Sequence, residues 1–191
     1  MSKSRLEAFT DAIIAIIMTI LVLELKTPKS ATLQGLWDIR YQLIIYLISF
    51  LSLAVYWNNH HHLLQIAQKI DGRVMWCNIF FILGLSFFPF AASWINTNIG
   101  SLVPELFYGF VVLFTNIFYL VLAKSLVHAN GKDSQVAQVM KGYKKPAITL
   151  SINTIGILLA FVIPAAVFVS YVISMIFWVV PERKIEKKFQ K

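Results

Sequence analysis

Long apolar stretches, separated by short polar or charged segments, recur along the whole chain. An α-helix needs about 20 predominantly apolar residues to cross the roughly 30 Å hydrocarbon core of a bilayer. Cutting the apolar runs at charges, prolines and polar clusters predicts six spans, at about 6–25, 39–57, 74–95, 104–126, 146–163 and 165–180. The pattern therefore predicts an all-α, polytopic membrane protein in which residues 1–191 form a single six-helix domain.

The last two spans come from one continuous apolar run between Pro146 and Val180, which is too long for a single crossing. Pro164 lies within this run, and proline ends or kinks a helix because it lacks a backbone N–H. We therefore expect a short helical hairpin that turns near Pro164. One kinked and steeply tilted helix is the alternative.

Composition agrees with a membrane protein and disfavours a soluble one. Hydrophobic residues make up 58% of the chain and charged residues 14%, with a mean hydropathy of +0.71, whereas soluble domains are about 45–50% apolar and about 25% charged. The net charge of +8 does not indicate nucleic-acid binding, because the basic residues lie between apolar spans and form no patch with exposed aromatic residues.

The distribution of Lys and Arg predicts the orientation of the spans. All but three of the 17 basic residues lie in the N-terminal segment, the 58–73 loop, the 124–145 segment and the C-terminal tail. The opposite set of connections holds only Lys26, Lys29 and Arg40. Because short cytoplasmic loops carry the excess of positive charge, both termini are predicted to face the cytoplasm.

The first span is unusual because it carries charged residues. A charged side chain at the centre of a membrane helix costs about 2.5–3.5 kcal/mol on insertion scales. Arg5 and Glu7 lie at the cytoplasmic end and Glu24 lies at the opposite end, but Asp11 lies about a turn and a half inside. We expect Asp11 to face the protein interior beside a cationic or hydrogen-bonding partner; an acid that only favours the helix N-terminus is the alternative.

One face of this helix forms a continuous stripe that excludes Asp11. At 100° per residue, a 4-3-4-3-1-3 spacing keeps seven residues on that face: Arg5, Phe9, Ala12, Ile16, Thr19, Ile20 and Leu23. An apolar stripe on a membrane helix is ordinarily a packing or lipid-contact surface. The periodicity alone therefore does not identify a pore.

A second polar cluster, W-N-N-H-H-H at 57–62, follows the second span on the same side of the membrane as Asp11. Adjacent histidines on a helix diverge by 100°, so they do not chelate one metal ion, and the chain has no H-x-x-x-H pair. A hydrogen bond from one histidine to Asp11 or to a backbone carbonyl is expected instead. No nucleophile occurs with a base and an orienting group, so we expect neither an enzyme nor a metal site.

The string Arg5-x-x-x-Phe9-Thr10-Asp11, followed by an apolar helix, closely resembles the R-x-x-x-F-S-D signature of the transmembrane protein 175 family. This family comprises endolysosomal potassium channels and their prokaryotic homologues. Thr10 stands where the family usually has serine, which is a conservative change. The resemblance continues through I-L-V-L-E-L-K-T-P after the first span and through Trp57, which precedes the histidines.

This resemblance implies a potassium-selective channel, a homotetramer in the cell membrane, with the first helices around a central pathway. It implies a hydrophobic constriction at Ile16, with Thr19 beside it and with Ile20 and Leu23 continuing the lining. It also implies a structural network at the cytoplasmic end, drawn from Arg5, Phe9, Thr10, Asp11, Trp57, His60 and His61. Potassium is then the permeant ion and no cofactor is needed; weak selectivity and proton permeability stay open. The length of the chain resembles the prokaryotic members, which implies a bacterial inner membrane.

Two other functions fit the residues less well. A proton-coupled secondary transporter would use Asp11 with His60 or His61 as a relay. Such transporters usually contain inverted repeats and paired broken helices, and neither is detectable in this chain. A non-conducting structural membrane protein is the remaining alternative.

Overall fold

The polypeptide is helical over most of its apolar runs. The computed structural model describes residues 2–142 and 144–179, and within them every regular element is a helix. These elements are α1 (Lys3–Leu23), α2 (Leu33–Asp38), α3 (Arg40–Gln65), α4 (Gly72–Ser86), α5 (Phe88–Thr97), α6 (Leu102–Asn130), α7 (Gln135–Met140), α8 (Lys145–Leu159) and α9 (Ala166–Val179). The predicted all-α class is confirmed for this part of the chain.

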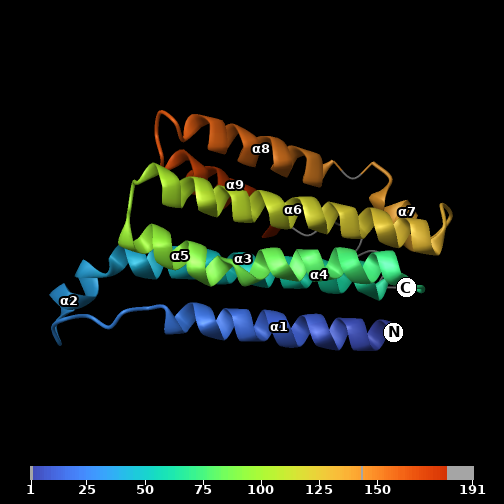
Figure 1. Ribbon diagram of the computed structural model, residues 1–191, viewed down its shortest axis with the longest axis horizontal. Coiled ribbons are helices and arrows are strands. Elements are labelled where there is room, and N and C mark those ends of the chain that lie inside the picture. Colours follow the sequence, from blue (N-terminus) through green and yellow to red (C-terminus); the bar gives the residue numbers. More distant parts are fainter. Residues whose placement is uncertain (1, 143, 180–191) are drawn as a thin grey trace.

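The long helices run back and forth along one common axis (Figure 1). Four helical segments are long and apolar enough to cross a membrane, namely α1, α3, the pair α4–α5 and α6. The shortest of them, α1, has 21 residues and is therefore about 32 Å long. Helix α6 packs against α4, α5, α8 and α9, whereas α1 lies at one edge of the bundle against α3, α4 and α5 (Figure 1).

The predicted span at 74–95 is divided in the structure. Helix α4 ends at Ser86 and α5 begins at Phe88, with Pro89 in its first turn. Proline cannot donate the backbone hydrogen bond that a continuous helix needs, and its ring crowds the preceding turn. Pro89 therefore accounts for the break between α4 and α5.

Two other helices are longer than the apolar pattern indicates. Helix α3 continues to Gln65 and so includes the whole histidine cluster, and α6 continues to Asn130. The predicted spans end near 57 and 126, where polar residues begin. Hydrophobicity predicts only the part of a helix that lies in the membrane core. Backbone hydrogen bonds continue through the polar residues that follow, so these helices are longer than their apolar runs.

Helices α8 and α9 form a short hairpin that packs against α6. Helix α8 has 15 residues, about 22 Å, and the turn before α9 contains Pro164. Helix α8 is shorter than a typical bilayer core is thick. That these two segments both cross the membrane, and that both termini are cytoplasmic, stay predictions; the tail beyond Val179 lies outside the described residues.

Two helix crossings are close because glycine occupies the contact. A Cβ atom at Gly84 would overlap the hydroxyl of Thr115 on α6 and lie 3.0 Å from Phe114, and a Cβ at Gly156 of α8 would overlap Ser170 of α9. Small residues let membrane helices approach each other and gain van der Waals contact. These glycines therefore set the distances between α4 and α6 and between α8 and α9.

We expect Gly84→Ala to lower the free energy of unfolding by about 1–3 kcal/mol, the usual effect of overpacking a close contact. Gly72→Ala is the matched control, because a Cβ at Gly72, the first residue of α4, meets nothing within 4 Å. The measurement is the thermal unfolding midpoint of the purified protein in detergent. Equal midpoints for the two variants would contradict the close crossing of α4 and α6.

Candidate functional site

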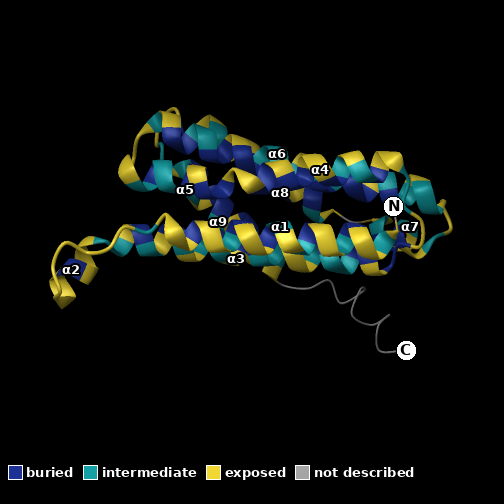
Figure 2. Cartoon of the chain, turned by 60° about the horizontal axis from the view of Figure 1, so that its bottom comes forward, coloured by how far each residue is buried: buried dark blue, intermediate teal, exposed yellow. Residues whose placement is uncertain are grey.

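Helix α1 has a buried face and an exposed face. The buried residues recur every three or four positions and pack against α3, α4 and α5; they are Leu6, Thr10, Ile14, Ile17 and Leu21. Every residue of the predicted stripe is exposed, namely Arg5, Phe9, Ala12, Ile16, Thr19, Ile20 and Leu23. Figure 2 shows the exposed residues of α1 along the outside of the bundle. Within the described residues, the predicted stripe is therefore left uncovered.

The middle of the exposed face combines apolar side chains with one hydroxyl. Ile16 is 56% exposed and Leu23 is 79% exposed. The hydroxyl of Thr19 donates to the carbonyl oxygen of Ile16 at 2.7 Å. Since this bond uses the hydroxyl hydrogen, the lone pairs of the Thr19 oxygen stay available to an ion or to water.

A groove flanks the stripe between α1 and the α4–α5 segment. Its volume is about 670 Å³, and its walls carry hydroxyl groups as well as apolar side chains. Ile16 and Ile20 line it from α1, and Ser86, Ser93 and Thr97 line it from the opposite side. The hydroxyls of Ser86 and Thr97 donate to carbonyl oxygens of their own helices.

A chain of hydrogen bonds joins the buried face of α1 to α3 and α4. Nε2 of His60 donates to Oδ1 of Asn78 at 2.7 Å, and Nδ2 of Asn78 donates to the hydroxyl of Thr10 at 2.8 Å. Thr10 in turn donates to the carbonyl oxygen of Leu6 at 2.9 Å. His60 is 1% exposed, and its ring stacks on Phe81 at 5.5 Å between centroids. Each of the three donor atoms in this series of hydrogen bonds therefore has an acceptor, as polar groups inside a membrane protein require.

Asp11 lies beside this chain and has a separate partner. Nε1 of Trp57 donates to Oδ1 of Asp11 at 2.9 Å, and the Trp57 ring stacks on His61 at 5.8 Å. His61 accepts a hydrogen bond from Gln65. Asp11 therefore has the hydrogen-bonding partner that its depth requires. The partner is an indole and not a cation.

Arg5 and Phe9 are predicted network residues that lie outside this cluster. The Arg5 side chain lies on the exposed face, and within the described residues it makes no hydrogen bond or ion pair. Phe9 also lies on the exposed face, whereas Thr10, Asp11, Trp57 and His60 are linked as described.

Asn78 is the residue that the sequence did not single out. It is fully buried and is the only connection, among the described residues, between His60 and Thr10. The available signal was one amide within an otherwise apolar span, a pattern shared with Asn116 and Asn153. Its partners depend on how α4 packs against α1 and α3, which the spacing of apolar residues does not give.

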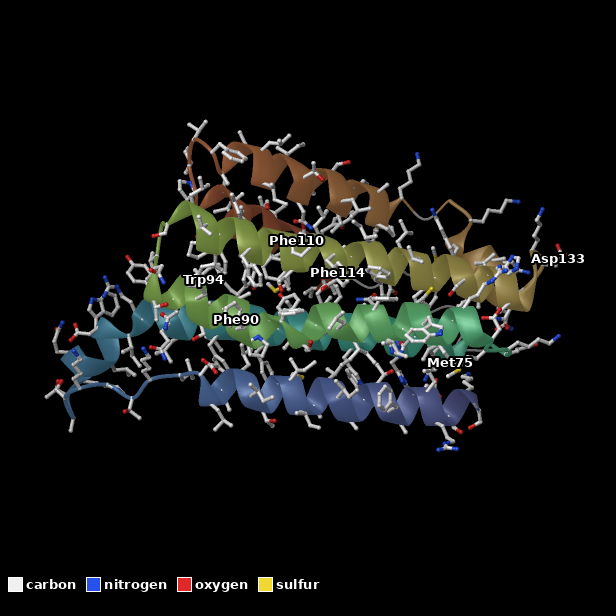
Figure 3. All side chains as sticks on the ribbon, viewed as in Figure 1. Met75, Phe90, Trp94, Phe110, Phe114 and Asp133 are labelled. Atoms are coloured by element: carbon white, nitrogen blue, oxygen red, sulfur yellow. The ribbon has the colours of Figure 1, made fainter. Side chains whose placement is uncertain are left out.

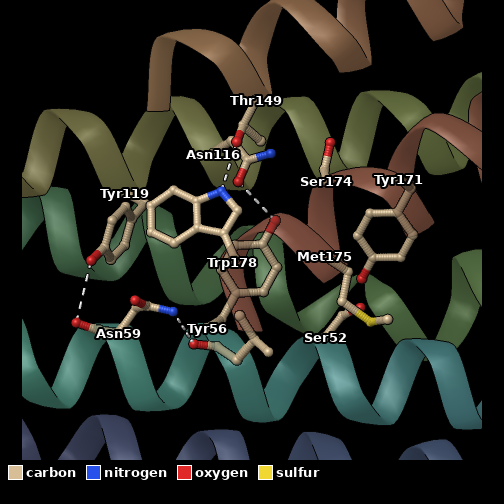
Figure 4. A pocket seen from close by; sticks show the side chains of 11 residues that line it. Ser52, Tyr56, Asn59, Asn116, Tyr119, Thr149, Tyr171, Ser174, Met175 and Trp178 are labelled. Atoms are coloured by element: carbon tan, nitrogen blue, oxygen red, sulfur yellow. Dashed lines mark hydrogen bonds between the residues drawn. The ribbon is translucent and has the colours of Figure 1, made fainter. Parts of the chain in front are cut away.

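A separate cavity lies inside the bundle, away from α1. It has a volume of about 30 Å³ and is lined from α3, α6, α8 and α9 by residues that include Tyr56, Asn116, Thr149 and Trp178 (Figure 4). Tyr56 donates to Asn116, and Trp178 donates to Thr149. This volume suits one or two water molecules. Within the described residues, no group of three or more His, Cys, Asp and Glu side chains is placed to hold a metal ion.

Comparisons with known proteins point to one family. A family model described as "Endosomal/lysosomal potassium channel TMEM175" matches residues 5–89. A Chryseobacterium sp. (strain P1-3) protein named as a potassium channel is 34% identical over 191 residues, 100% of both chains. A Danio rerio protein named "Endosomal/lysosomal proton channel TMEM175" is 29% identical over 103 residues, which are 50% of this chain and 19% of that protein.

The fold has a close counterpart among solved structures. The crystal structure of a lysosomal potassium-selective channel TMEM175 homolog from Chamaesiphon minutus superposes with a TM-score of 0.81. The match covers 93% of this chain and 96% of that chain at 22% sequence identity. The two chains therefore share their fold.

We expect Asn78→Ala to lower the free energy of unfolding by about 1–2 kcal/mol, because His60 and Thr10 then lose buried partners. Asn58→Ala is the control, since Asn58 is an exposed asparagine on α3 close to His60. Thermal unfolding in detergent is the measurement. A control that unfolds as early as Asn78→Ala would show that the hydrogen-bonded chain does not stabilise the subunit.

Proposed function

We propose that this chain, which belongs to the transmembrane protein 175 family, forms a potassium-conducting channel whose pathway is lined by the exposed face of α1. The observation that carries the proposal is the division of α1 into two faces. The predicted pore stripe is exposed along its whole length, while the opposite face is buried in the subunit. The choice of potassium as the permeant ion rests on the names of the relatives, which are potassium or proton channels.

The proposal requires several copies of the chain around one axis. A single stripe cannot enclose a pathway, whereas a closed symmetric ring of identical stripes can. The groove between α1 and α4–α5 supports such a ring, because its hydroxyl-bearing wall suits contact with a neighbouring subunit better than contact with lipid. We propose four copies, as the family resemblance implies.

Ile16 and Thr19 would have different roles in this pathway. A ring of Ile16 side chains is apolar, so water and ions leave the constriction when the ring is narrow, which closes the channel. Thr19 lies one turn further along the stripe, and its hydroxyl hydrogen is already bonded to the backbone. The lone pairs of the Thr19 oxygen, and not its hydrogen, would therefore face a partly dehydrated cation.

The hydrogen-bonded groups behind α1 would set the position of the stripe. The Thr10–Asn78–His60 chain and the Trp57–Asp11 bond both hold α1 against the helices behind it. Neither lies on the stripe, so their role is support for gating and not ion coordination. Arg5 has no such contact among the described residues, so we assign its share in the network to a contact with a neighbouring copy.

A flux measurement tests the proposed function directly. Purified protein in liposomes is expected to pass potassium down its gradient, and this flux should persist when a protonophore removes any proton gradient. A potentiometric dye reports the movement of charge. Strict dependence of potassium movement on a proton gradient would favour the transporter that uses Asp11 and His60 or His61. Proton movement without potassium movement would identify the permeant ion as the proton.

We expect Ile16→Asn to raise the flux or to lower the selectivity for potassium over sodium, because an amide wets the constriction. Ile155→Asn on α8 is the matched control: Ile155 is 55% exposed, almost the same as Ile16, but does not lie on α1. The same liposome assay measures both variants. Unchanged flux and selectivity in Ile16→Asn would show that Ile16 does not line the pathway.

A further inference from the structure

A second groove lies between the start of α4 and the last turns of α6. Its volume is about 840 Å³, and its lining combines cationic, hydroxyl and aromatic side chains, including Arg73, Trp76, Lys124, Ser125 and His128. No residue of α1 lines it. The groove therefore differs in position and in charge from the groove beside the proposed pore.

The cationic side chains of this groove have no anionic partner within the described residues. Arg73 donates to Nε2 of His128 at 3.3 Å, which fixes the guanidinium in the groove without neutralising it. Asp71 also lines the groove, but its Oδ1 accepts the backbone N–H of Val74 at 2.9 Å and caps α4.

An aromatic seam continues from the groove along the contact between α4 and α6. Trp76 is 63% exposed and lies 6.3 Å from Phe80, which stacks on Phe118 of α6 at 4.9 Å. Phe118 contacts Phe114 at 4.6 Å, and Phe114 lies 6.1 Å from Phe110. Figure 3 shows Phe110 and Phe114 beside the α4–α5 segment, along α6. An apolar track therefore starts at a cationic pocket and runs parallel to the helices.

We propose that this groove and seam bind an anionic phospholipid. The phosphate of the headgroup lies between Arg73 and Lys124, and one acyl chain lies along the seam from Trp76 towards Phe110. Basic pockets between membrane helices on the cytoplasmic side suit anionic headgroups, and an exposed tryptophan suits the membrane interface. The inference is independent of the proposed pore and uses only the predicted cytoplasmic location of Arg73 and Lys124.

The test compares two lipids on the intact protein. Purified protein is reconstituted with equimolar phosphatidylglycerol and phosphatidylcholine, and native mass spectrometry counts the lipids that stay bound. Wild type is expected to retain phosphatidylglycerol preferentially. Arg73→Ala with Lys124→Ala should reduce this preference by about fivefold for each removed charge. Because both side chains are exposed, the double variant should fold. If the double variant does not fold, the same measurement is made on Lys124→Gln alone.

The control removes equal charge at the same end of the bundle. Lys69→Ala with Lys132→Ala changes two exposed lysines that do not line the groove, and it should keep the preference. Equal loss of preference in the two double variants, or no preference in wild type, would overturn the proposal. Displacement of the lipid by millimolar inorganic phosphate would also overturn it, because the site would then recognise free phosphate.

Discussion

The rotation of α1 about its own axis decides which residues this membrane protein exposes, and the hydrogen bond between Asn78 and Thr10 fixes that rotation. A rotation of α1 by 100° about its axis would move Thr10 off the buried face. It would also expose a residue adjacent to Ile16, such as Ile17, in place of Ile16. Nδ2 of Asn78 would then lie buried without its acceptor on Thr10, at a cost of about 1–3 kcal/mol, whereas the bond between Asn78 and His60 joins α4 to α3 and would stay. The polar chain thus selects one rotational state, which apolar packing alone selects weakly because lipid is as apolar as the core.

Asp11 restricts the same helix in a second direction. Adjacent residues diverge by 100°, so Asp11 meets α3 at Trp57 while Thr10 meets α4 at Asn78. An indole donor satisfies a carboxylate oxygen and also places a large apolar ring at the membrane boundary. These two hydrogen bonds to two different helices help to hold α1 at the edge of the bundle, where the described residues leave its other face exposed.

The sequence predicts the helical class, the family and the faces of α1 for different physical reasons. The thickness of the bilayer fixes the length of an apolar run that predicts a membrane helix. The helical period of 3.6 residues puts Ile16 and Ile17 on different faces of α1. The all-α class and the family are confirmed. The pore roles of Ile16 and Thr19 stay predictions. The pairing of His60 with Asn78 was not predictable, because it depends on how three helices cross. The ends of α3 and α6 were missed since polar residues outside the bilayer core continue a helix without changing its backbone.

Helix α4, continued by α5, connects the two surfaces for which we propose a function. Ser86 and Phe90 line the groove beside the α1 stripe, whereas Arg73 and Trp76 line the cationic groove beside α6. Between these grooves, Gly84 allows close contact with α6 and Asn78 bonds to Thr10 of α1. A shift of α4 against α6 therefore moves the partner that sets the rotation of α1. The break before Pro89 interrupts the helical hydrogen bonding of this segment, so its two halves need not move together, and the half that carries Asn78 is the half that borders the cationic groove.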